Sequence, residues 1–547
     1  MKLRQASFVC CLVAFTVSTA SAQQPFIAGP GNQNGGQRGL NGLAGPNNGP
    51  PGQQGGGANA DFDSLIDLIV STVASETWAE NGGGEAEIRP YVGGVYADSR
   101  GALRRLTVVE KGSLTGDLKR TAARLASVRE RAAAAAQAPA GDARTSSGLR
   151  CVSLARLERE LVRKKSMGEP VEPAMLTLAG LRRVRYVVML PPDGDQPGDV
   201  VLAGPAGDWR VVGDGRIVAI DNQANGDRYA GGSIVRLDDL LTLMRRVWSG
   251  SEGPFGCSIN PRSEALAEAQ AYLNTSAQKP IAKGRRDAWL KGLRERVGEQ
   301  DIEVFGVDPS SRVAGVLVEA DHHMKLVGIG LAESVPGVKS YLDQLAASGG
   351  EVTSSTGVLR WWFAMNYSAV NASPESDAFE LVGAGAKVMS ETELLTERGG
   401  RVPTGQSDEL AAQFAADFTR HFERLCNKYP VYAELRNTFD LALAVQLAHV
   451  AHEADARQWR PGFFLDARQL PLPAYERAKT VQTVVNHREV NRRRFVASVS
   501  GGVWSDARSV LKKKLTPVAR SGYGPLGERP VATPGDLPEQ AWWWDAQ

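Results

Sequence analysis

Two stretches decide the fold class of this chain: residues 255–273, FGCSINPRSEALAEAQAYL, and residues 304–331, VFGVDPSSRVAGVLVEADHHMKLVGIGL. Each begins with an apolar segment that ends at a proline turn, at Pro261 and at Pro309 respectively. An apolar run closed by a turn and followed by a longer periodic segment predicts a strand, a turn and a helix. Because this unit occurs twice, we expect both copies to lie on one sheet.

The neighbouring segments extend this mixed pattern. Phe414, Phe418, Phe422, Leu425 and Tyr429 are spaced as on one amphipathic helix that ends before Pro430. Residues 435–450 are apolar on nearly every side and predict a central helix, so the two together predict a helical hairpin. Further strands are predicted at residues 184–190, 200–202, 209–212, 217–220, 359–367, 378–389, 481–487 and 495–499, and a further helix at residues 237–247. The expected fold class is α+β, or mixed α/β, with a multi-layer globular body.

The first 22 residues are typical of a secretory signal peptide. Basic residues Lys2 and Arg4 precede an apolar run over 8–17, and the small residues before Gln23 suit cleavage after Ala22. The apolar run is about half the roughly 20 residues that a spanning helix needs. We therefore expect a mature chain without a transmembrane segment, exported to the periplasm or secreted.

The mature chain then divides by composition. Residues 23–60 are rich in Gly, Pro, Asn and Gln, with Arg38 as the only charge over 25–60, which predicts a disordered tether. The remaining predicted parts are a small α+β module at 61–110, a connecting helix and linker at 111–149, an α/β domain at 150–350, an α+β domain with the helical hairpin at 351–510, and a C-terminal tail at 511–547.

Charge and cysteine content exclude two classes of protein. The formal net charge of +2 falls to zero once Lys2 and Arg4 leave with the signal peptide, whereas a dedicated nucleic-acid binder needs a basic excess. Cys151, Cys257 and Cys426 remain, and three cysteines allow at most one internal disulfide. The chain is therefore not a disulfide scaffold, and its stability must come from a hydrophobic core.

Five segments, in order, resemble a family of exported planctomycete proteins known as domain of unknown function 1598 (DUF1598). They are VVLAGPAGDWRVVGDGRIV (200–218), FGCSINPRSEALAEAQAYL (255–273), VFGVDPSSRVAGVLVEADHHMKLVGIGL (304–331), LRWWFAMNY (359–367) and YPVYAELRNTFDLALAVQL (429–447). The resemblance spans about residues 150–460. The stretch LIDLIVSTVASETWAENGG (65–83) also resembles a small N-terminal module of exported proteins in such bacteria. The family has no assigned activity, so the resemblance implies no catalytic residue.

Glu319, Asp321, His322 and His323 form the densest group of candidate metal ligands. A strand would place Glu319, Asp321 and His323 on one face, whereas a helix would bring Glu319 beside His322 and His323. Either geometry presents a carboxylate with an imidazole, as a divalent metal site requires. The alternative interpretation is a polar face beside a buried element.

His449, His452 and Glu453 offer a second metal hypothesis on the predicted central helix. Their order is HxxHE, which differs from the HExxH motif of zinc proteases. No GxxxxGK[ST] or GxSxG motif occurs, and no other cofactor is evident. Gly383 and Gly385 predict a hairpin turn rather than a dinucleotide-binding loop, because residue 388 is Val where that loop needs a third glycine.

Tryptophans are the candidate binding residues. On the predicted strand, alternation sends Trp361 and Trp362 to opposite faces, so one joins the core and the other is available to stack a sugar or anchor a partner. Trp542, Trp543 and Trp544 near the C-terminus either fold back onto the body or form a docking motif.

These observations favour a non-enzymatic exported scaffold or interaction protein, with a cell-envelope protein or polymer as its partner. The alternative is a metal-dependent hydrolase built on the Glu, Asp and His group around residues 319–323. The sequence does not indicate an oligomeric state.

Overall fold

The structure is a computed structural model that describes two stretches of backbone near the N-terminus and most of the chain from residue 142 onward. The described ranges are 87–91, 94–98, 142–211, 217–220, 232–251, 253–277, 285–350, 357–395, 401–483, 485–491, 493–519, 537–538 and 540–546. The predicted signal peptide and tether lie outside them, as do most of the small module and of the connecting helix.

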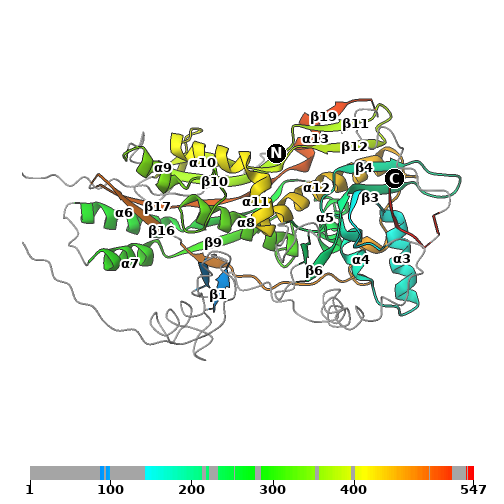
Figure 1. Cartoon of the computed structure of the whole chain (residues 1–547), viewed down its shortest axis with the longest axis horizontal. Helices are drawn as coiled ribbons and strands as arrows, with labels where there is room; N and C mark the ends of the chain where they lie inside the picture. The colour runs from blue at the N-terminus through cyan, green and yellow to red at the C-terminus, as the bar shows by residue number, and fades with distance from the viewer. Residues whose placement is uncertain are drawn as a thin grey trace, which may run out of the picture. The chain divides into compact units, whose positions relative to one another are not determined.

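The chain divides into two compact units. In the first, β1 (Glu87–Tyr91) and β2 (Gly94–Asp98) form an antiparallel hairpin. The second holds every described residue from 142 onward, and Figure 1 shows its elements in order.

Two seven-stranded sheets organise this second unit. The first sheet has the order β14 (Arg401–Pro403), β13 (Gly385–Leu395), β10 (Gly357–Asn366), β18 (Ser500–Ser505), β8 (Phe255–Pro261), β9 (Glu299–Phe305) and β15 (Thr480–Gln482). The second sheet has the order β19 (Leu515–Pro517), β11 (Ala369–Ala372), β12 (Ala378–Val382), β4 (Tyr186–Leu190), β5 (Asp199–Ala206), β3 (Ser147–Ser153) and β20 (Trp543–Asp545). Two small hairpins accompany them, β16 (Val485–Val490) with β17 (Arg493–Ser498), and β6 (Trp209–Val211) with β7 (Ile217–Ala219).

The described helices are as follows: α3 (Leu154–Ser166), α4 (Pro173–Leu176), α5 (Leu237–Trp248), α6 (Ser263–Ala277), α7 (Arg286–Val297), α8 (Arg312–Gly328), α9 (Tyr341–Ala347), α10 (Glu409–Arg420), α11 (Phe422–Lys428), α12 (Pro430–Ala454) and α13 (Ala507–Lys514), with the short 3₁₀ helices η4 (Leu178–Gly180) and η5 (Phe463–Leu465). In Figure 1, α6, α7 and α9 lie toward the opposite end of this unit from β3 and β4. The mixed α+β class predicted from the sequence is confirmed.

The two strand-turn-helix units are present as predicted. β8 runs into α6, and β9 runs into α8 after a turn at Pro309. The two strands are neighbours in the first sheet and pair antiparallel, with Cys257 opposite Val304. Thus the segments that indicated the fold lie side by side on one sheet, as expected.

A long antiparallel ribbon connects the two sheets. One half pairs β10 with β13 in the first sheet, and the other half pairs β11 with β12 in the second sheet. The predicted strand over 378–389 is therefore two strands, and the predicted hairpin turn at Gly383 and Gly385 is instead the bend between them. Gly383 has φ of 141°, and a Cβ there would lie 2.6 Å from the Asn366 carbonyl oxygen, so a glycine suits this bend.

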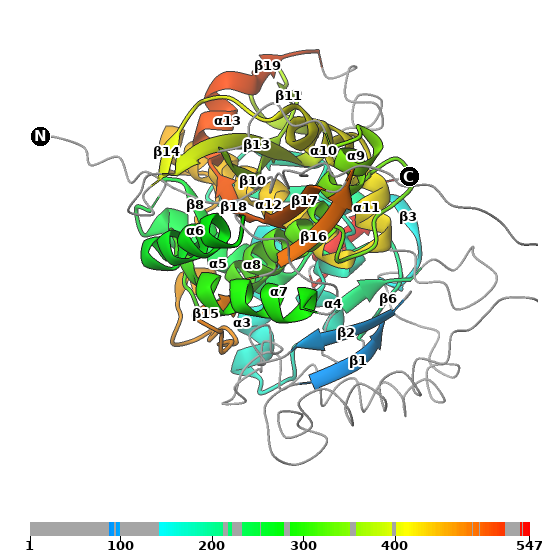
Figure 2. The same cartoon turned by 90° about the vertical axis from the view of Figure 1, so that its left-hand side faces the viewer.

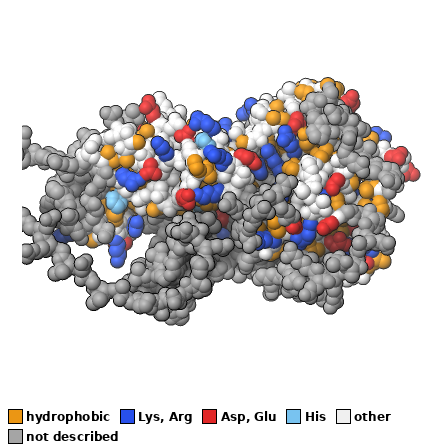
Figure 3. Space-filling model, in the orientation of Figure 1, with side chains coloured by type: hydrophobic (Ala, Val, Ile, Leu, Met, Phe, Trp, Pro, Cys, Tyr) orange, Lys and Arg blue, Asp and Glu red, His pale blue; other side chains and the backbone are white. Residues whose placement is uncertain are grey.

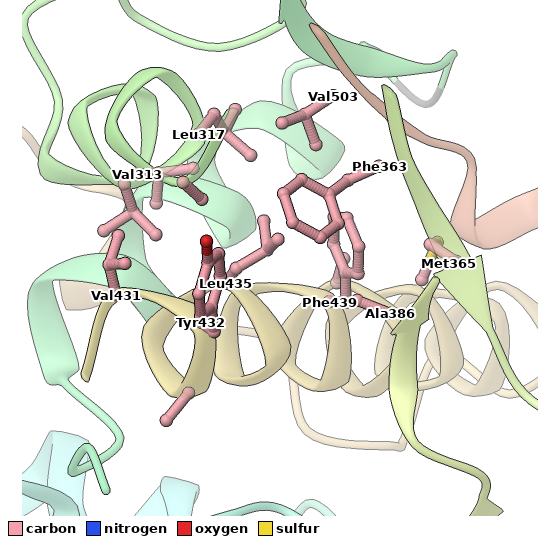
Figure 4. Close-up of a cluster of buried hydrophobic side chains, with 14 of the residues drawn as sticks. Val313, Leu317, Phe363, Met365, Ala386, Val431, Tyr432, Leu435, Phe439 and Val503 are labelled. Atoms are coloured by element: carbon pink, nitrogen blue, oxygen red, sulfur yellow. The ribbon is translucent and has the colours of Figure 1, made fainter. Parts of the chain in front are cut away.

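α12 is the central helix. Its residues from Val431 to Ala448 are buried, and it contacts both β13 and β4, so it packs against both sheets. Figure 2 shows α8 and α12 beside the strands of the first sheet. Their apolar side chains meet those of β10, β13 and β18 in one cluster, drawn in Figure 4, where Phe363 faces Tyr432 and Phe439 of α12.

The predicted helix over residues 414–429 is two helices. α10 ends at Arg420 and α11 begins at Phe422, with His421 between them in a non-helical conformation. Pro430 occupies the first turn of α12, where its missing N–H costs no hydrogen bond. The helical hairpin is therefore α10 and α11 followed by α12.

Both sheets take strands from either side of residue 350. The first sheet combines β8 and β9 with β10, and the second combines β4 and β5 with β12. All described residues from 142 onward also fall in one compact unit. The division at residue 350 that composition suggested does not correspond to two separate folding units.

Candidate functional site

Residues 319–323 lie on α8, so the helical geometry is the one that applies. Asp321 is fully buried, and its Oδ2 lies 2.7 Å from Lys325 Nζ. Burial raises the pKa of Asp321, whereas the Lys325 ammonium opposes that rise. A Cβ on Gly501 would lie 2.7 Å from Asp321 Oδ1, so this pair packs directly against β18.

Both histidines of this segment are largely buried. His323 Nδ1 makes a 2.8 Å hydrogen bond with the Tyr432 hydroxyl of α12, and its ring centroid lies 4.4 Å from that of Tyr429. Burial lowers the pKa of His323 to about 4 and that of His322 to about 3, so both imidazoles are neutral at pH 7.

Asp321 thus faces β18 while His323 faces α12. Glu319 is half-buried on the same helix and makes contacts of its own. Across the described residues, no three His, Cys, Asp or Glu side chains lie close enough together to hold a metal ion. The geometry does not bring the predicted ligands of this segment to one point.

His449 and His452 lie near the C-terminal end of α12. The Nε2 atom of His449 is 3.6 Å from Glu453 Oε1, and its ring meets the edge of Trp248 with a centroid distance of 4.9 Å. His452 Nδ1 lies 3.2 Å from the Gln458 carbonyl oxygen. These two histidines are therefore engaged with different partners.

The structure also contains a buried charged cluster that the sequence did not reveal. Arg236 makes a bidentate pair with Asp238, at 2.9 and 2.7 Å, before and within the first turn of α5. Arg312 of α8 bonds Asp239, and its second guanidinium nitrogen lies 2.7 Å from Glu434 of α12. Two arginines and three carboxylates thereby join the helices α5, α8 and α12.

The carboxyl groups of this cluster differ in pKa. Burial raises the pKa of Asp239 to about 7, and the negative charge of Asp238 adds to the rise while Arg312 opposes it. Burial also disfavours ionisation of Asp238, yet the paired Arg236 guanidinium holds the pKa of Asp238 below its usual value. Perturbed carboxyl groups often mark active sites, but here each is buried against arginine, which indicates a structural role.

A second buried pair fixes the bend of the ribbon to α12. Asp440, which is fully buried, accepts a 2.8 Å hydrogen bond from Arg183 Nε and a 2.6 Å hydrogen bond from the Tyr367 hydroxyl. Nothing in the spacing of the sequence connects Arg183 with Asp440, because the pair exists only once the two sheets have assembled. The signal available was weaker: Asp440 is one of a few charged residues in a helix whose middle is mostly apolar.

The predicted alternation of the Trp361 strand is confirmed. Trp361 is fully buried, packs on Phe414 and donates a 3.3 Å hydrogen bond from Nε1 to the Ala411 carbonyl oxygen. Trp362 faces the other way, is half-buried and carries the Arg360 guanidinium 4.4 Å from its ring centroid.

Of the two alternatives for the C-terminal tryptophans, the structure shows that they fold back. Trp543 and Trp544 belong to β20, which pairs antiparallel with β3 at the edge of the second sheet. Trp542, Trp543 and Trp544 are all buried, at 4%, 7% and 7% exposure. Arg150 lies beneath Trp543 and makes bidentate hydrogen bonds to Asp545 of 2.8 and 2.9 Å.

Cys151, Cys257 and Cys426 are buried and free, and burial raises each thiol pKa, which disfavours a nucleophilic thiolate. None of the described helices has both the length and the apolar character needed to cross a membrane. The described fold is mixed α+β, and the buried ionisable groups described above contact other residues of the core.

Residues 257–341 match the family model described as Protein of unknown function (DUF1598), so the resemblance noted from the sequence is confirmed over this segment. The match runs from β8 to the start of α9 and includes both strand-turn-helix units. No curated protein and no solved structure matches the chain.

Proposed function

We propose that this chain is a non-enzymatic scaffold or interaction protein of the cell envelope, exported by its N-terminal signal. The observation that carries the proposal is a contrast in position between the candidate metal ligands and an aromatic side chain. The candidate metal ligands Asp321 and His323 are engaged inside the core, whereas Trp362 lies on a sheet face directed away from it. Aromatic side chains of that kind are enriched at binding surfaces.

The charge distribution agrees with this role. Figure 3 shows basic and acidic side chains interspersed over the visible face rather than gathered by sign. A surface of this kind supports recognition by shape and aromatic contact more than attraction to a polyanion.

The test combines processing with binding. Full-length chain is produced in a Gram-negative host, and the product in the periplasmic fraction is sequenced from its N-terminus. We expect it to start at Gln23 and to sediment saturably with isolated cell envelopes. An uncleaved product in the cytosol, or a processed chain that stays in the supernatant at every envelope concentration, contradicts the proposal.

The alternative hypothesis, a metal-dependent hydrolase, can be tested separately by measuring the metal bound to the purified protein. It requires a stoichiometric divalent metal in the purified protein, reduced by Asp321→Asn or His323→Ala and retained in the control Asp455→Asn. Since Asp321 faces Lys325 and His323 faces Tyr432, we expect no metal in the protein and no shift of its thermal midpoint with a chelator. Stoichiometric metal that disappears in the two variants would favour the hydrolase.

A further inference from the structure

The last strand of the chain lies across the whole second sheet from the strand that precedes it. β19 and β20 are consecutive in the sequence, yet they form opposite edges of that sheet, and β20 pairs with β3. Six interstrand spacings of about 4.8 Å separate the two edges, roughly 29 Å in all. The connection over residues 518–542 has 25 residues and can extend to about 80–90 Å at most. Its length therefore does not restrict β20 to its own copy of the chain.

The edge of β3 carries a carboxylate site whose main group is held in place without β20. Arg150 of β3 donates from Nη1 to the Ala179 carbonyl oxygen at 2.8 Å and from Nη2 to the Thr145 carbonyl oxygen at 3.1 Å. Neither acceptor belongs to β20, so these bonds orient the guanidinium independently of that strand. Its Nε and Nη2 atoms then bond both carboxylate oxygens of Asp545. A guanidinium fixed in this way presents a fork that matches one carboxylate.

The turn that supplies one of these carbonyl groups has an unusual backbone. Leu178 and Ala179 are fully buried and have φ of 43° and 54°, in the left-handed region that residues other than glycine rarely adopt. Such residues persist only where the surrounding structure holds them, and they cluster where a protein clamps a ligand. Here the turn directs the Ala179 carbonyl oxygen to Arg150.

The strand that occupies this edge is contacted on both of its faces. Trp543 lies on the same face as Asp545, in the larger hydrophobic core, with the Arg150 guanidinium 4.5 Å from its ring centroid. Trp544 lies on the opposite face, in the smaller cluster that includes Cys151. Main-chain pairing with β3 holds the segment extended, while the side-chain contacts set its sequence. The site therefore suits an extended peptide with the order aromatic, aromatic, aspartate.

We propose that the edge of β3 is a peptide-binding site that accepts the C-terminal strand of a second copy of this chain in exchange for its own. The two strands have the same sequence, so Arg150 makes the same contacts with either one. This inference goes beyond the proposed function, because it requires no component of the envelope.

Protein concentration decides which strand occupies the site. A connection of this length keeps the chain's own strand at an effective concentration on the order of 1 mM, so β20 stays in its own copy in dilute solution. Exchange between copies becomes comparable once the copies themselves reach about 1 mM. The exchange then links two copies through the contacts that each already contains.

The first measurement tests the peptide-binding site by fluorescence anisotropy. The probe is a labelled peptide of residues 539–547, EQAWWWDAQ, added to the mature chain carrying Asp545→Ala. The strand of this variant lacks its ion pair with Arg150, so it competes less well. We therefore expect the variant to bind the peptide about tenfold or more tightly than the parent does. Asp455→Ala, which removes the partner of the exposed Arg457, is the matched control and should bind as the parent does.

A second peptide tests the role of the aspartate. It has the same sequence with Asp545→Ala, and we expect it to bind the variant chain about tenfold more weakly than the first peptide. If the Asp545→Ala chain does not fold, as judged by circular dichroism, Asp545→Asn provides the same comparison with the shape of the side chain kept.

The second measurement tests the second copy as the occupant. Ala546 donates a main-chain hydrogen bond to Leu149, so the two residues are neighbours across β20 and β3. One chain carries Leu149→Cys and another carries Ala546→Cys, and the two are mixed under oxidising conditions at about 1 mM. We expect a disulfide-linked pair of chains that is absent from a mixture at about 1 µM. A chain with both substitutions should form the bond internally at either concentration, which is the control for its geometry.

The two measurements can fail separately. No peptide binding to the Asp545→Ala chain, equal binding by that variant and the parent, or equal binding of the two peptides overturns the peptide-binding site. An internal disulfide in the doubly substituted chain without any disulfide between chains at about 1 mM overturns the second copy as its occupant.

Discussion

Gly328 ends α8 directly against the largest fully buried side chain of the described core. A Cβ added there would lie 2.3 Å from Trp361 Cζ3, and the indole is held by Phe414, so the ring has little room to move. Alanine normally stabilises a helix relative to glycine by up to about 1 kcal/mol. At this position we expect the opposite sign.

Gly328→Ala should therefore lower the free energy of unfolding by about 1–3 kcal/mol, the usual cost of overpacking. Urea denaturation measures the change. Gly292→Ala in α7 is the control, because a Cβ there meets only the ends of the Tyr272 and Arg296 side chains. A stabilised Gly328→Ala variant would show that the Trp361 ring can shift to make room for the added methyl group.

The buried charged cluster predicts a pH dependence at the same scale. Asp239 has a pKa of about 7 in the folded protein and about 4 when unfolded, so between these values the folded state holds the extra proton. Its contribution to stability is present below pH 4 and is lost as the pH rises to about 7. Asp239→Asn cannot ionise and should remove that loss.

The measurement is the free energy of unfolding of both proteins at pH 5 and pH 8. We expect the parent to lose at least about 1 kcal/mol more than Asp239→Asn over this interval. His322 and His323, whose pKa values are lowered, contribute equally to the pH dependence of both proteins, so their contributions cancel in the comparison. Asp455→Asn, at an aspartate paired with the exposed Arg457, should keep the parental difference. Equal losses in the parent and in Asp239→Asn would contradict the assignment.

Among the elements, those set by local periodicity were predicted and those set by tertiary contact were not. β8, β9, α5 and α12 follow from apolar spacing and proline turns. β18 was missed because Gly501 and Gly502 weaken the strand pattern, yet these glycines let it approach Asp321 and the backbone of β8. The candidate site shows the same difference. Strand alternation correctly predicted that Trp361 and Trp362 face opposite sides of the sheet, whereas nothing in the sequence spacing indicated the pairing of Arg183 with Asp440.

The C-terminal strand β20 supplies the charge partner of a buried arginine. Arg150 is fully buried and relies on Asp545 for its charge partner. Asp545→Ala should destabilise the protein by about 1–3 kcal/mol, since a buried guanidinium is left with carbonyl partners only. Guanidinium chloride denaturation measures this. Asp455→Ala is the control, because the arginine that pairs with Asp455, Arg457, is exposed. Equal midpoints for the two variants would contradict a structural role for β20.

At the scale of the whole unit, the ribbon of β10 to β13 and the helix α12 tie the two sheets together, and one continuous hydrophobic core includes residues of both. Leu202 of β5 and Val503 of β18 lie in that core but in different sheets.

Leu202→Ala should lower the free energy of unfolding by about 2–5 kcal/mol and Val503→Ala by a smaller amount, since a smaller side chain is lost. Because both side chains belong to the core that the two sheets share, both substitutions should lower the same unfolding transition. Thermal unfolding, followed by far-ultraviolet circular dichroism and tryptophan fluorescence, tests this. Two separate transitions in either variant would instead support the two domains predicted on either side of residue 350.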